Sequence, residues 1–282
     1  MYEVIFLWVL ALVYIAFAVI QDIKTHEIAD WLNFSLIVFA LGFRLFYSLF
    51  QGEFSFFYNG LIGLVVFFLV GNLFYYGKIF AGGDAKLMIA LGAVIPLQIS
   101  FIENIQNFMS FIFIFLVIGF CYIIISSLFL MIRNFKDFKK EFLKQFHKNK
   151  KLLIIMTVIS IVFLMLGFLE SILFVFGLLI LFSIYLYLYS KSIDEVCMVK
   201  TVLSKDLTEG DWLYKSLKIG KYTIKANWDG LTKEDIKKII KKYKKVTIKR
   251  GVPFSPTFLI SFILFIIINF LKIDLWNSFW KP

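Results

Sequence analysis

Two aspartates stand out in this sequence because each one lies where an apolar run ends. Asp22 occurs in the segment QDIKTHEIAD, and Asp84 occurs 62 residues later in the segment FAGGDAKL. Two carboxylates brought together at a partly desolvated site cannot both ionise at low cost, so one keeps a proton while the other stays charged. The charged carboxylate can take a proton from water while the neutral one polarises a peptide carbonyl. The pair therefore predicts peptide hydrolysis, whereas either aspartate alone would be an ordinary solvated residue.

Four neighbours of the aspartates could support such a site. Gly82 and Gly83 lack side chains, which would let a substrate backbone approach Asp84 and let the chain turn sharply into the next helix. Lys24 and Lys86 each follow an aspartate by two residues, and they could stabilise its charged form or bind lipid phosphate. A turn and a solvated surface are the plainer interpretations of these four residues.

No metal and no cofactor is expected at this site. The chain has two histidines and two cysteines, the cysteines lie far apart, and no CxxC pair occurs. These are too few ligands for most zinc sites, and they indicate no disulfide framework.

The elements that must position the aspartates are membrane helices. Of the 282 residues, 61% are hydrophobic and 17% are charged, whereas a soluble domain is about half apolar and about a quarter charged. This excess excludes an ordinary cytosolic enzyme and a disordered protein. The predicted fold class is an α-helical polytopic membrane protein with a small cytoplasmic α+β domain. A membrane helix needs about 20 apolar residues, and we expect about eight transmembrane helices, at 4–20, 32–50, 60–77, 86–102, 108–132, 152–169, 171–190 and 255–272.

The positive charges predict which side of the membrane each segment faces. With the N-terminus outside, all basic residues except Arg44, Lys272 and Lys281 fall on the cytoplasmic side, as the positive-inside rule requires. The first and third spans then both run inward, which brings Asp22 and Asp84 out at the same face. We therefore expect a multi-pass protein of the cell membrane whose active site and soluble domain are cytoplasmic.

The chain divides into four predicted segments. Residues 1–132 form a membrane core that carries both aspartates, and residues 133–190 form a basic cytoplasmic loop and a transmembrane hairpin. Residues 191–254 form the α+β domain, and residues 255–282 form a C-terminal transmembrane helix and tail. Within the α+β domain, Thr232 followed three residues later by an acid predicts a helix N-cap. The sixteen basic residues of this domain indicate a solvated face attracted to membrane lipid, and no motif indicates a nucleic-acid partner.

The order of these motifs resembles the type IV prepilin peptidases, which are membrane aspartic peptidases with a GxGD-type motif. A span, D-I-K-x-x-x-I, two further spans and G-G-D-A-K-L follow one another, and Asp22 and Asp84 match the two catalytic aspartates of that family. The segments EGDWL (209–213), 228–236 and RGVPF (250–254) resemble the C-terminal region of its archaeal preflagellin and prepilin peptidase branch. The likeness covers residues 1–105 and 191–272 well, and residues 133–190 poorly.

The resemblance implies a membrane-embedded aspartic endopeptidase. Such an enzyme removes the short basic leader from type IV prepilin-like or preflagellin (archaellin) precursors, just before a hydrophobic helix, at the cytoplasmic border of the membrane. Ala81 stands where a strict GxGD motif has glycine, and the lack of CxxC pairs predicts no N-methyltransferase activity. A signal-peptide-peptidase-like intramembrane protease and, from another class, an ion-coupled transporter are the alternatives. The sequence leaves open whether the substrate is flagellin-like or pilin-like.

Overall fold

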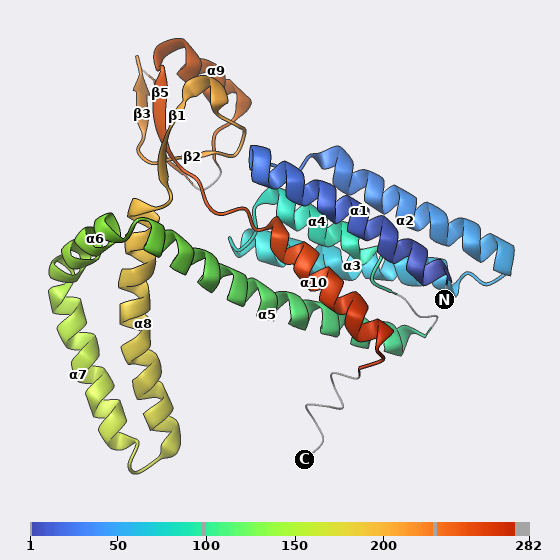
Figure 1. Cartoon of the computed structure of the whole chain (residues 1–282), viewed down its shortest axis with the longest axis horizontal. Coiled ribbons are helices and arrows are strands. Elements are labelled where there is room, and N and C mark those ends of the chain that lie inside the picture. The colour runs from blue at the N-terminus through green and yellow to red at the C-terminus, as the bar shows by residue number, and fades with distance from the viewer. Residues whose placement is uncertain (1, 97–99, 221, 228–229, 274–282) are drawn as a thin grey trace. The chain divides into compact units, whose positions relative to one another are not determined.

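The computed structural model of the chain describes residues 2–96, 100–220, 222–227 and 230–273 (Figure 1). The chain separates into two units, of which the first comprises Met1–Ile123 and Pro253–Pro282 and the second comprises Ile124–Val252. The first unit therefore joins the C-terminal helix to the N-terminal helices. The four-part division made from the sequence treats that helix as a separate segment, and it stays a prediction.

The first unit is a bundle of helices (Figure 1). Its helices are α1 (Tyr2–Thr25), α2 (Asp30–Gln51), α3 (Ser55–Tyr76), α4 (Gly82–Gly92), the first part of α5 (Phe101–Arg133) and α10 (Ser255–Phe270). Helix α1 packs against α2 and α10, whereas α4 packs against α2 and α3. Fully buried phenylalanines of α3, α5 and α10 fill much of the core, and the Phe115 and Phe258 rings lie 4.7 Å apart. This packing holds α10, from the far end of the sequence, against the N-terminal helices.

Helices α3 and α4 approach closely because glycines lie at their interface. A Cβ atom on Gly63 would lie 2.3 Å from the carbonyl oxygen of Gly92, and one on Gly71 would lie 3.0 Å from the carbonyl oxygen of Ala85. Small residues let the backbones of membrane helices come together in this way. Ala85 directly follows Asp84, so the contact with Gly71 helps to set where Asp84 lies.

The helices confirm a polytopic helical membrane protein, but their lengths differ from the expected eight spans. Among the described residues, five helices are long and apolar enough to cross a membrane, namely α1, α2, α3, α5 and α8 (Ser171–Val196). A sixth crossing is possible if the bent pair of α6 (Phe135–Lys148) and α7 (Lys150–Leu166) counts as one span, and α10 is a shorter apolar helix.

The run at 86–102 shows why the count is lower. Its helix, α4, has only 11 residues, which at 1.5 Å per residue is about 17 Å, or roughly half the hydrocarbon thickness. The helix ends at Gly92, a few residues before Pro96. A proline cannot donate a backbone hydrogen bond and disfavours helix in the residue before it. An apolar run of the right length is therefore not one continuous helix here.

The second unit begins with the end of α5 and continues through the helices α6, α7 and α8. Helix α7 ends at Leu166 and α8 begins at Ser171, so the chain turns near the boundary between the predicted spans 152–169 and 171–190. The Ser160 hydroxyl donates a hydrogen bond to the Gly177 carbonyl oxygen at 2.8 Å. This bond ties α7 to α8, and the axes of α6 and α7 meet at a bend of 76°.

A small α+β domain completes the second unit, as the sequence predicts. Its elements are β1 (Val199–Leu203), a 3-10 turn (Ser204–Asp206), β2 (Trp212–Leu213), β3 (Leu217–Ile219), β4 (Tyr222–Ile224), α9 (Lys233–Lys242) and β5 (Lys245–Lys249). Strand β5 pairs antiparallel with both β1 and β2, and β3 pairs antiparallel with β4. The predicted N-cap is confirmed: the Thr232 hydroxyl accepts from the Asp235 backbone N–H at 3.2 Å, and the Asp235 carboxylate accepts from the Thr232 N–H.

Candidate active site

Asp22 lies on the inward face of α1, near its C-terminal end. The buried residues of this helix are Leu7, Ala11, Ile15, Ala18 and Asp22, and their spacing of three or four places them along one side. A stripe of apolar side chains therefore ends in a carboxyl group, which is only 8% exposed.

Asp84 lies in the first turn of α4, at the third helical position. The chain is extended at Ala81 and the helix begins at Gly82, so the Asp84 carboxylate can accept a hydrogen bond from the Ala81 backbone. This is half of a capping box, in which a side chain satisfies an amide at the start of a helix. Asp84 is also only 8% exposed.

The fold brings these two carboxyl groups into electrostatic contact. Burial, followed by the negative charge of Asp22, raises the pKa of Asp84 from 3.8 to about 7, and the hydrogen bond with Ala81 opposes the shift. Asp84 lies before the apolar run at 86–102, and α4 is not among the helices that are long enough to cross a membrane. With a pKa of about 7, Asp84 keeps its proton in about half of the molecules at neutral pH.

The first turn of α4 touches the loop that follows α1. A Cβ atom on Gly83 would lie 3.1 Å from Cβ of Ile28, so glycine allows α4 to begin against the loop that follows α1. That loop is held in place because the Ala29 N–H donates to Oε1 of Gln21 at 3.1 Å. At Gly82, in contrast, the nearest atom that a Cβ atom would meet among the described residues belongs to the Tyr75 ring, 3.9 Å away.

The two predicted supporting lysines lie in different surroundings. Lys86 forms an ion pair with Asp30 at 2.5 Å, which joins α4 to the first turn of α2. Lys24 is exposed, and it lies two residues beyond Asp22 on a helix whose buried stripe runs along the other side. The structure thus gives Lys86 a partner other than the aspartate pair, and the supporting roles of both lysines stay predictions.

Ser255 lies beside Asp22, although sequence reasoning did not select it. Its backbone N–H donates a hydrogen bond to Oδ2 of Asp22 at 3.2 Å, and Ser255 is the first residue of α10. The local signal was the proline that follows it, because proline near the first helical position marks a helix start. No signal in the sequence connects that start to α1, which lies 233 residues earlier.

Arg44 donates hydrogen bonds to the chain at the C-terminal end of α4, the end away from Asp84. Sequence reasoning placed it among the charges outside the membrane, but it is fully buried in α2. Its guanidinium group donates to the carbonyl oxygens of Ala93 at 2.8 Å, Phe56 at 2.9 Å and Val94 at 3.0 Å, and also to that of Pro96. Carbonyls at the end of a helix lack intrahelical partners and carry partial negative charge. Arg44 therefore stabilises the short helix that carries Asp84.

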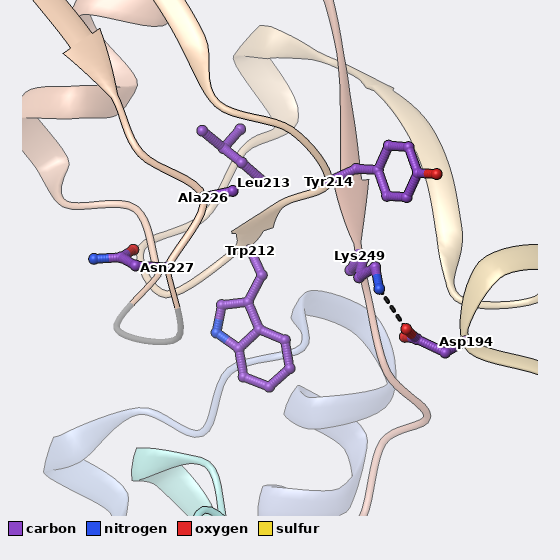
Figure 2. Close-up of a pocket in the computed structure, with 7 residues that line it drawn as sticks. All are labelled: Asp194, Trp212, Leu213, Tyr214, Ala226, Asn227 and Lys249. Carbon is purple, nitrogen blue, oxygen red and sulfur yellow. Dashed lines mark hydrogen bonds and ion pairs between the residues drawn. The ribbon is translucent and has the colours of Figure 1, made fainter. Parts of the chain in front are cut away.

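The described part of the chain contains no other cluster with obvious chemistry. No group of three or more histidine, cysteine, aspartate or glutamate residues could hold a metal ion among these residues. A hollow of about 330 Å³ lies in the second unit. Figure 2 shows the residues that line it, which are Asp194, Trp212, Leu213, Tyr214, Ala226, Asn227 and Lys249. Its two charged side chains pair with each other, so neither is left to receive a charged ligand.

Comparison with known proteins finds a family that matches the aspartate-bearing segment. Residues 6–132 match the type IV leader peptidase family, and this stretch contains both Asp22 and Asp84. The resemblance indicated by the sequence motifs is confirmed over these residues.

Two archaeal proteins show the same relationship over a shorter stretch. A preflagellin peptidase of Methanococcus maripaludis is 34% identical over 79 residues, which is 28% of this chain and 34% of the relative. A preflagellin peptidase of Methanocaldococcus jannaschii is 32% identical over 79 residues, which is 28% of this chain and 33% of the relative. The chain spans about a third of the length of the curated relatives it matches. No solved structure matches it.

Proposed function

We propose that this protein is a membrane aspartic endopeptidase whose catalytic residues are Asp22 and Asp84. The observation that carries the proposal is the pairing of two buried carboxyl groups from distant parts of the sequence. The pair lies within the stretch that matches the type IV leader peptidase family. Buried acids that repel each other are costly in a fold, and such pairs are characteristic of sites that transfer protons.

The two carboxyl groups would act as one acid–base unit. Asp84, whose pKa is raised to about 7, supplies the proton that polarises the carbonyl of the scissile peptide. Asp22 takes a proton from water, and the water oxygen adds to the carbonyl carbon. When the carbon–nitrogen bond breaks, a proton from the pair moves to the leaving amine, so that hydrolysis consumes one water and no metal or cofactor. The pair titrates as a unit, and each macroscopic step belongs to both residues.

The proposed substrate is a prepilin-like or preflagellin precursor. The relatives are named preflagellin peptidases, and the charge distribution of the sequence supports an active site at the cytoplasmic border. A substrate whose hydrophobic helix lies in the bilayer would present its short basic leader at that border, and confinement there would supply much of the rate gain. Membrane lipid is the second proposed partner. Gly83 would keep α4 close to the Asp22 loop, and Gly82 would leave room for the substrate backbone.

The decisive experiment is coexpression of the protein with candidate preflagellin and prepilin precursors, with leader removal scored by gel mobility. Asp22→Asn and Asp84→Asn keep the shape of each side chain but remove its acid chemistry, so each should abolish leader removal while membrane insertion persists. Asp206→Asn is the matched control, because it neutralises an exposed acid in the 3-10 turn of the second unit. Full processing by either inserted variant of the pair would contradict the proposal.

A further inference from the structure

We propose that the first turn of α10 is a third part of the aspartate site, in which Ser255 is the positioning residue for Asp22. This inference rests on the proposed function. It assigns a role to a segment that lies outside the stretch matching the family, since that stretch ends at residue 132. The role also gives a purpose to Pro253 and Phe254, which end the segment RGVPF and contact α5 and the chain before α4.

The contact with Asp22 has the chemistry of a helix start. The first amides of a helix have no intrahelical partner and carry partial positive charge, and the Ser255 N–H directs this charge to Oδ2 of Asp22 at 3.2 Å. Pro256 occupies the next position and has no N–H to offer. The Ser255 amide is therefore the donor at this corner of the helix, and it restricts where the Asp22 carboxylate can lie.

A second feature of Ser255 indicates that the start of α10 binds a water molecule or another polar group. The Ser255 hydroxyl is fully buried and has no hydrogen-bond partner among the residues that the structure describes. A buried polar group without a partner is rare, and it is commonly satisfied by water or a ligand. A water molecule bound by this hydroxyl would lie close to Asp22, which is where the attacking water of the proposed reaction is required.

The chain just before Ser255 is anchored firmly enough to position an amide. The Tyr122 hydroxyl of α5 donates a hydrogen bond to the Pro253 carbonyl oxygen at 2.8 Å. The Phe254 ring lies 5.9 Å from that of Phe80 and 5.9 Å from that of Phe115. Phe80 precedes the start of α4, so the same aromatic cluster locates both the helix that carries Asp84 and the helix that contacts Asp22.

The test compares two variants of Ser255 in the full-length protein. Ser255→Ala removes the hydroxyl and keeps the amide, whereas Ser255→Pro removes both groups at a helix position where proline is otherwise favoured. A hydrogen bond to a charged group that is lost in this way should lower kcat by about tenfold or more, so we expect Ser255→Pro to be at least this much slower than Ser255→Ala. The amide favours a charged carboxylate, so the acid limb of the pH–rate profile should move to higher pH in Ser255→Pro alone.

Equal kcat values and equal acid limbs for the two Ser255 variants would overturn the inference. If Ser255→Pro does not fold, Tyr122→Phe decides the question, because it loosens the anchor without changing Ser255. The inference then requires a lower kcat with an acid limb moved to higher pH, and an unchanged profile overturns it. The wild type and Asp84→Asn are assayed in parallel. A wild type that cleaves no precursor contradicts the proposed function. An active wild type, together with Ser255→Ala and Ser255→Pro variants that have the same kcat and the same acid limb, contradicts only this inference.

Discussion

Replacing Arg44 with methionine should loosen the helix that carries Asp84. The guanidinium group donates to four backbone carbonyl oxygens, three of which follow the end of α4, at Ala93, Val94 and Pro96. The fourth belongs to Phe56, whose ring also lies 4.3 Å from the guanidinium carbon. Methionine keeps a long side chain in this space but offers no donor, so all four carbonyl oxygens lose this partner at once.

The size of the effect follows from the number of bonds. A buried acceptor left without a donor costs about 1–3 kcal/mol, so four acceptors cost about 4 kcal/mol at the low end of that range. Removal of the charge also removes its desolvation cost in the fold, so we expect a net loss of about 3 kcal/mol in the free energy of unfolding. The free energy of unfolding of Arg44→Lys should lie between those of the wild type and Arg44→Met, because an ammonium group has three donors but lacks the planar fork of arginine.

The assay is thermal unfolding of the purified protein in detergent, together with leader cleavage and hydrogen exchange of the α4 amides. Arg44→Met should unfold at a lower temperature, exchange the α4 amides faster and cleave more slowly, since α4 positions Asp84. Arg133→Met is the matched control, because Arg133 is exposed at the end of α5. An Arg44→Met variant as stable as that control, with unchanged exchange in α4, would refute the reasoning.

Four further predictions concern the aspartate site. Gly83→Ala should reduce cleavage more than Gly82→Ala, because the new methyl group of the first meets Ile28 at 3.1 Å while that of the second has 3.9 Å to its nearest neighbour; equal losses would contradict this. Cleavage should fall as the pH rises above about 7, where Asp84 loses its proton. The raised pKa also means that the neutral carboxyl group stabilises the fold fully below pH 3.8 and that this contribution is lost as the pH rises to about 7; a wild type and an Asp84→Asn variant with the same pH dependence of unfolding would exclude it. EDTA should leave cleavage unchanged, and a loss that zinc restores would show that a metal takes part.

Much of the site was within reach of sequence reasoning because its signals are local. The three- and four-residue spacing that places Asp22 on the buried side of α1 can be read along a single helix. The order of spans and charges was enough to bring Asp22 and Asp84 to one face, and the Thr232 cap depends on residues three apart. These features depend on the period of a helix and on the distribution of charge, which are properties of nearby residues.

The sequence predicts a membrane span at 86–102, but the helix there, α4, is shorter and ends at Gly92. Hydropathy sums apolar character over a window, and the window at 86–102 has enough of it to predict a crossing. It does not register that the helix stops at Gly92, where the freed carbonyl groups need a donor from another helix. Arg44 supplies that donor from 49 to 52 residues away, so a charge that the positive-inside count assigns to the outer side is in fact buried.

The sequence by itself determined that this is a helical membrane protein, and it predicts two acids at one border of the membrane, because composition, periodicity and charge bias act over short distances. Tertiary structure decided which groups surround those acids. The Ser255 amide reaches Asp22 across 233 residues, and Gly83 meets Ile28 only because α4 begins against the loop after α1. Such contacts depend on how helices pack, and packing is set by the shapes of side chains from distant segments that no local pattern connects.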